Sequence, residues 1–78
     1  MARERGVVRW WKDDKGYGRI NAEDGVILYC HFMSIDQMEG FRSLRGGDVV
    51  EFERVLAPGP NGTRWEAKHV VRLEPSSH

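Results

Sequence analysis

Clusters of turn-forming residues divide this chain into short pieces, and their spacing limits the folds that it can adopt. The clusters lie at residues 13–16, 23–25, 45–48 and 57–62, and each combines glycine with aspartate, asparagine or proline. The segments between them have the length of strands and are rich in β-branched and aromatic residues. No window of eleven residues repeats apolar residues at helical spacing. Strands are therefore predicted at 7–12, 17–22, 26–32, 49–56 and 64–73.

Five short strands in 78 residues predict an all-β protein whose sheet closes into a small barrel. Closure removes the exposed edges that a flat sheet would leave. A chain of this length forms one hydrophobic core, so residues 1–78 are expected to be a single domain. An OB-type barrel is the candidate, and an SH3-like barrel is the structural alternative, because the strand count alone does not separate the two. The longest connection, 33–44, is expected to hold one helical turn near 34–37, capped by Ser34.

The charges and the cysteine content restrict the partners and the compartment. The formal net charge is zero, but residues 1–20 carry six basic and three acidic side chains, which suggests a local anion-binding face. Scattered, solvated charge is the alternative interpretation. The single cysteine, Cys30, excludes an internal disulfide and fits a reducing compartment. No apolar run approaches the roughly 20 residues that cross a bilayer, and the first residues do not resemble a signal peptide, so a cytoplasmic protein is expected.

Alternation along two predicted strands gathers aromatic and basic side chains on one face. Tyr17 and Arg19 share a face of their strand, and Tyr29 and His31 share a face of the next. If the turn at 23–25 joins these strands as a hairpin, the four side chains become neighbours on the outer surface. Exposed rings interleaved with cations suit the stacking of unpaired bases. The alternative is a purely structural pair of tyrosines.

The glycines and the last two strands carry further expectations. Gly16 and Gly18 have no side chain, so they are expected to let a ligand approach the backbone closely. Arg54 is expected to point outward through a bulge, with Val55 taking its place in the core. Trp65 is interpreted as packing on the loop at 58–60 or as extending the binding surface.

Three stretches of the sequence resemble the bacterial cold-shock domain family. They read GVVRWWKDDKGYGRI, ILYCHF and GFRSLRGGDVVEFE, in that order and at compatible spacing. The resemblance covers about residues 6–73 and leaves 74–78 as a flexible tail. It implies a five-stranded antiparallel OB barrel that binds single-stranded RNA or DNA without catalysis. It further implies an RNA chaperone or a regulator of transcription or translation, with a mild preference for pyrimidines.

The resemblance also implies which side chains meet the nucleic acid. These are Arg9, Trp10, Lys15, Tyr17, Tyr29, His31, Phe32, Phe41 and Arg42, to which Arg19 is added on its own chemistry. Arg19 stands where the family usually has a third central ring, and its guanidinium plane can stack on a base or pair with phosphate. Strict alternation places Trp10 opposite Arg9 and Trp11, so Trp10 reaches the ligand only if its strand bends or bulges.

The sequence gives less support to other classes of function. Cys30 and His31 are adjacent and alternate to opposite faces, so no metal site is predicted, and no cofactor is expected. No readable motif places a base and an acid beside a nucleophile, so an enzyme is not expected. The serious alternative is an OB barrel whose aromatic face binds a protein or a second copy. A monomer is expected, and a dimer that swaps strands across 33–44 is the further possibility.

Overall fold

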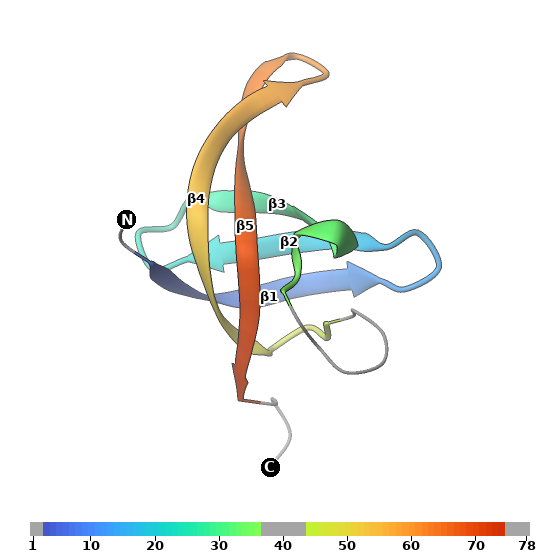
Figure 1. Ribbon diagram of the computed structural model, residues 1–78, viewed down its shortest axis with the longest axis vertical. Helices are drawn as coiled ribbons and strands as arrows, with labels where there is room; N and C mark the ends of the chain where they lie inside the picture. The colour runs from blue at the N-terminus through green and yellow to red at the C-terminus, as the bar shows by residue number, and fades with distance from the viewer. Residues whose placement is uncertain (1–2, 37–43, 75–78) are drawn as a thin grey trace.

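The computed structural model describes residues 3–36 and 44–74 as a closed β-barrel (Figure 1). The strands are β1 (Glu4–Lys12), β2 (Tyr17–Ala22), β3 (Ile27–His31), β4 (Val49–Gly59) and β5 (Gly62–Glu74). A single 3-10 helix among the described residues, η1 (Phe32–Ser34), follows β3 directly. The predicted all-β class and closed five-stranded barrel are confirmed.

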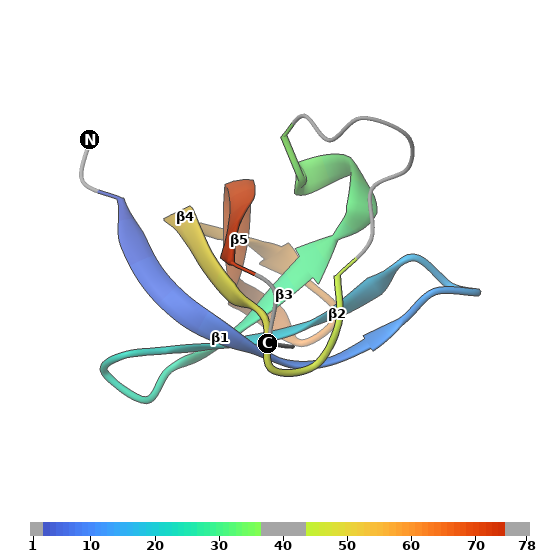
Figure 2. The same ribbon diagram turned by 90° about the horizontal axis from the view of Figure 1, so that it is seen from below.

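The strands follow one another around the barrel in the order β1-β2-β3-β5-β4. The pairs β1–β2, β2–β3, β1–β4 and β4–β5 are antiparallel. The ring closes through a parallel contact between β3 and β5, with Tyr29 paired to Glu66. Figure 1 shows β4 and β5 crossing β1, β2 and β3 at a steep angle, and in Figure 2 the β1–β3 sheet curves around them. This closure brings β5 beside the strand that carries Tyr29.

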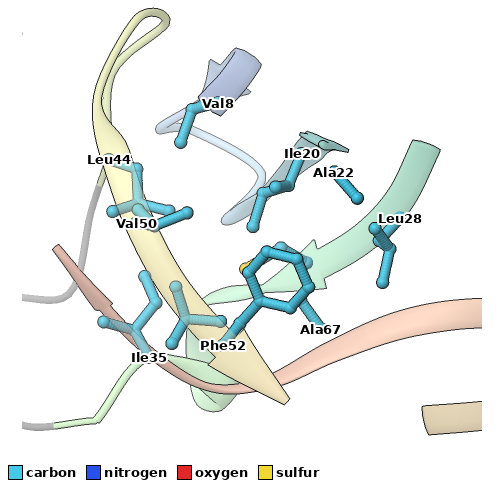
Figure 3. Close-up of a cluster of buried hydrophobic side chains, with 11 residues drawn as sticks. Val8, Ile20, Ala22, Leu28, Ile35, Leu44, Val50, Phe52 and Ala67 are labelled. Atoms are coloured by element: carbon cyan, nitrogen blue, oxygen red, sulfur yellow. The ribbon is translucent and has the colours of Figure 1, made fainter. Parts of the chain in front are cut away.

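The core lies inside this ring and follows the alternation of the strands (Figure 3). Leu28 and Cys30 are fully buried, as the alternation of β3 predicts. They join a cluster made of Val8, Ile20, Ala22, Ile35, Leu44, Val50, Phe52, Ala67 and Val70. Burial raises the pKa of the Cys30 thiol to about 12, because the thiolate would lose its hydration inside the barrel. Cys30 is therefore a neutral apolar filler.

The connection after β3 differs from the expected one. The helical turn occupies Phe32–Ser34 instead of 34–37, and its cap is His31, whose Nδ1 accepts a hydrogen bond from the Met33 amide at 3.2 Å. Ser34 is buried at the end of this turn, so its predicted role as cap is wrong. Ile35 then forms a parallel bridge with Val70, which draws the chain back onto the barrel. Residues 37–43 lie outside the described part of the chain.

The hairpin of β4 and β5 is longer than predicted and projects beyond β3 (Figure 1). Its strands pair without interruption from Glu53 and Lys68 to Gly59 and Gly62, around a two-residue turn at 60–61. An apolar-rich segment that contains two prolines at 58 and 60 is thus a strand and a tight turn instead of a loop.

The expectation for Arg54 and Val55 is wrong. The register shift lies before Arg54, where Phe52 alone faces two residues of β5, so the extra residue belongs to β5. Arg54 is paired with the buried Ala67 and therefore stays on the inward side, at the end of the barrel. There it donates two hydrogen bonds to Glu4, at 2.9 and 2.6 Å, and one to Asp24 at 3.2 Å. An ion-paired arginine therefore occupies this position in place of an apolar side chain.

Candidate nucleic-acid interface

Trp10 reaches the outer face of β1 through a shift in register. Val8 is opposite Ile20, whereas Trp10 is opposite Arg19, so β1 carries one extra residue between the two pairs. This is the predicted bulge that lets Trp10 reach the outer face. Beyond the shift, Trp11 turns inward and packs against the core.

The register of β1, β2 and β3 then sets six side chains in two rows. The first row reads Trp10, Arg19 and Tyr29 across the three strands. The second row reads Lys12, Tyr17 and His31. A cation therefore lies beside a ring on β1 and on β2, whereas β3 carries two rings. The cross-strand neighbours expected from alternation occur in this register.

The rings of this surface form one continuous chain of contacts. Trp10 meets Tyr17 edge-on at a centroid distance of 5.9 Å, and Tyr17 lies 5.9 Å from Tyr29 with only 28° between their planes. His31 follows Tyr29 at 6.5 Å and is itself 4.7 Å from Phe32. We call Trp10, Tyr17, Tyr29, His31 and Phe32 the aromatic face. Tyr17, Tyr29 and His31 have similar tilts, with 28° and 26° between neighbouring planes, whereas Trp10 is edge-on to Tyr17.

Phe32 joins the aromatic face because β3 ends one residue before it. Strict alternation assigns Phe32 to the core side, together with Leu28 and Cys30. In the structure, the chain turns into η1 at Phe32, which leaves its side chain 38% exposed beside His31. The hydrogen bond that His31 Nδ1 accepts places the ring proton of neutral His31 on Nε2. His31 thus fixes this corner of the face as well as belonging to it.

The glycines of the KGYGRI stretch make room for the protein's own side chains. A Cβ on Gly18 would lie 2.7 Å from Cε3 of Trp11 and would also collide with the Trp10 carbonyl oxygen. A Cβ on Gly16, whose φ is 76°, would lie 2.8 Å from the Phe32 ring. The space expected for a ligand is therefore filled from within, and these glycines position Trp11 and Phe32.

Three cations lie over the aromatic face. Arg19 lies 5.4 Å from the centroid of Trp10 and 5.0 Å from that of Tyr29. Lys12 Nζ is 5.9 Å from the Trp10 ring, and the Arg64 guanidinium carbon is 4.0 Å from the Tyr29 ring. Lys12 and Arg64 were not among the predicted site residues. Lys12 was detectable, since it lies two residues after Trp10, whereas Arg64 depends on the parallel pairing of β5 with β3.

The remaining predicted site residues are not gathered with the rings. Arg9 is exposed at the register shift of β1, and Lys15 is exposed in the turn before β2. Within the described part of the chain, neither side chain has a ring or ion-pair contact with the aromatic face. Phe41 and Arg42 lie outside the described residues.

The same surface offers little to other chemistry. In residues 3–36 and 44–74, no three histidine, cysteine, aspartate or glutamate side chains are grouped to hold a metal ion. No helix of this part of the chain is long and apolar enough to cross a membrane. Flat rings flanked by cations are suited to stacking on bases and neutralising phosphates.

Comparison with known proteins agrees with this chemistry. The family described as 'Cold-shock' DNA-binding domain matches residues 4–73. Cold shock protein CspB of Geobacillus stearothermophilus is 43% identical over 70 residues, which are 90% of this chain and 98% of that protein. A cold shock-like protein of Thermotoga maritima is 41% identical over 70 residues, with the same two shares of 90% and 98%. The major cold shock protein CspA of Pseudomonas aeruginosa is 42% identical over 69 residues, which are 88% of this chain and 96% of that protein.

Proposed function

Because the chain belongs to the cold-shock domain family, we propose that its aromatic face binds single-stranded RNA or DNA by base stacking. The family consists of nucleic-acid binders and not of enzymes, so the chain is a binding protein without catalysis. In this proposal, Tyr17, Tyr29, His31 and Phe32 are the main platforms. Arg9, Lys12, Lys15 and Arg19 neutralise phosphates, and Trp10, Phe41 and Arg42 extend the path.

The observation that carries the proposal is the continuous chain of rings with cations set among them. Neighbouring centroids on β2 and β3 are 5.9 and 6.5 Å apart. Successive bases in a duplex strand rise by only about 3.4 Å. Bases that rest on successive rings must therefore be separated from one another, which only an unpaired, extended strand allows. The spacing favours single strands over duplexes.

Such binding gives an RNA chaperone without any energy source. A strand held on the rings cannot pair with itself, so the protein shifts the equilibrium of weak hairpins toward the open form. Sequence preference is mild and leans toward pyrimidines, because every base has a face that stacks. Through the same competition, the protein regulates transcription or translation. We place this activity in the cytoplasm and take the monomer as the active form.

The alternative function is an interaction module that binds a protein or a second copy of the chain. It draws support from Leu56 and Trp65, which are directly opposite each other on the projecting hairpin and are 56% and 40% exposed. The formal net charge of zero also fits it. A swapped dimer would reveal itself by an elution volume that depends on protein concentration in size-exclusion chromatography.

The test is the fluorescence anisotropy of a labelled oligothymidine of about seven nucleotides, titrated with the protein at about 50 and about 200 mM salt. The proposal expects saturable binding that weakens at the higher salt, because each phosphate contact releases a counterion. A longer GC-rich duplex, which stays paired at both salt concentrations, is the control and should bind much more weakly. Binding of neither ligand at low salt would refute the proposal and favour the interaction module.

A further inference from the structure

Arg64 covers the central ring of the aromatic face. Its guanidinium carbon is 4.0 Å from the Tyr29 centroid, the shortest of the cation–ring distances in the described residues. Stacked bases are about 3.4 Å apart, so a base inserted between this guanidinium and the ring would need nearly twice the space that is present. A base can therefore stack on the covered side of Tyr29 only if Arg64 moves.

Two contacts hold Arg64 in this place. Its Nε donates a hydrogen bond to Glu66 at 3.0 Å, and the Glu66 side chain is only 12% exposed. Across the hairpin, the Arg64 Cδ would lie only 3.0 Å from a Cβ built on Gly59. The aliphatic part of the Arg64 side chain therefore packs on Gly59. Glu66 is also the residue through which β5 pairs with Tyr29. The hairpin thus presents the guanidinium to the ring in a fixed orientation.

We propose that Arg64 is an intramolecular cap that competes with a nucleic-acid base for Tyr29 and so lowers the affinity of the site. This inference rests on the proposed function of the aromatic face. Breaking an exposed cation–ring contact weakens the binding of a competing base by about twofold to fivefold in Kd. The cap therefore sets the affinity below the value that the rings alone would give, and a bound strand releases the guanidinium toward its phosphates.

The Arg64→Lys variant distinguishes stacking of the guanidinium on Tyr29 from an effect of its positive charge alone. Lysine keeps the positive charge but has no planar group to lie on the ring. Its contact with the ring should be weaker, so we expect this variant to bind the oligothymidine more tightly than wild type, by up to about fivefold, with an unchanged salt dependence. Arg5→Lys is the matched control and should bind like wild type, because Arg5 is exposed on the part of β1 that pairs with β4. Unchanged or weaker binding by Arg64→Lys would overturn the cap.

A double-mutant comparison ties the effect to the ring. In a Tyr29→Ala background, Arg64→Lys should change the affinity by less than its effect in wild type, because the surface that it uncovers is gone. An equal gain in both backgrounds would overturn the cap, since Arg64 would then act on something other than Tyr29.

Nuclear magnetic resonance follows the cap directly. In the free protein, the Hδ protons of Arg64 should be shifted upfield by the Tyr29 ring, and saturation with oligothymidine should return them toward unshifted values. Protons that stay upfield in the complex would overturn the cap and leave the proposed function intact. Failure of wild type and Arg64→Lys alike to bind would instead refute the proposed function, and the cap with it.

Discussion

Replacing Tyr29 by alanine removes the platform on which most of the aromatic face converges. The Tyr29 ring lies 5.9 Å from Tyr17 and 6.5 Å from His31, and two guanidinium groups lie 5.0 and 4.0 Å from it. A base stacked on such a ring contributes about 1–3 kcal/mol to binding. Displacing Arg64 from the Tyr29 ring reduces this stacking contribution by about 0.5–1 kcal/mol. Mid-range values of the two contributions give a net loss on Tyr29→Ala of about 1 kcal/mol, or about fivefold in Kd, and the largest difference between the two ranges is about 2.5 kcal/mol.

The anisotropy titration with labelled oligothymidine measures this loss. Ile27→Ala is the matched control, because Ile27 lies on the same face of β3, is 48% exposed and carries no ring. It should leave Kd unchanged. Urea unfolding of both variants shows that the barrel persists at the assay temperature. A folded Tyr29→Ala protein with the wild-type Kd, or an equal loss in Ile27→Ala, would refute stacking on this ring.

Other predictions concern the barrel that supports the face. Gly18→Ala should lower the free energy of unfolding in urea by more than about 2 kcal/mol, because the new Cβ meets Trp11; a change below about 0.5 kcal/mol would contradict this. The Cys30 thiol, with its pKa raised to about 12, should resist iodoacetamide near pH 8 until urea unfolds the protein; rapid alkylation of the native state would show an exposed thiol. The hydrogen bond from Arg54 lowers the pKa of Asp24 below its usual 3.8, so their contribution to stability is present above about pH 4 and is lost as the pH falls through the lowered value. The difference in melting temperature between wild type and Arg54→Met should shrink as the pH falls below this lowered value, and a difference that stays constant from about pH 6 to about pH 2 would show that Arg54 acts through packing alone.

The closed barrel and the outward placement of Tyr17, Arg19, Tyr29 and His31 follow from local rules. Turn residues mark the strand ends, and alternation decides which side chains share a face. These rules operate within one or two strands, so a single sequence is enough to apply them. The burial of Leu28 and Cys30 was predictable for the same reason.

The features that sequence reasoning missed depend on contacts between distant segments. Arg64 reaches Tyr29 only because β5 pairs with β3 and so closes the barrel. No local sequence pattern indicates a parallel pair of this kind. Phe32 leaves the core side because His31 caps a 3-10 turn, which ends the alternation one residue early. Gly18 resembles an open approach to the backbone until the inward turn of Trp11 fills the space above it. In each case, a tertiary contact overrides a local preference.

The three tryptophans allow one spectrum to test the central claim that the aromatic face is the nucleic-acid site. Trp10 belongs to that face, Trp11 has its indole nitrogen buried, and Trp65 points away from Arg64 on the projecting hairpin. A ¹H–¹⁵N spectrum, with indole signals assigned by Trp→Phe variants, is recorded during titration with oligothymidine. The Trp10 signal should shift and saturate with the Kd from anisotropy, while the Trp65 signal stays in place. A saturating shift of Trp65 with Trp10 unmoved would contradict the account and place the binding site on the hairpin.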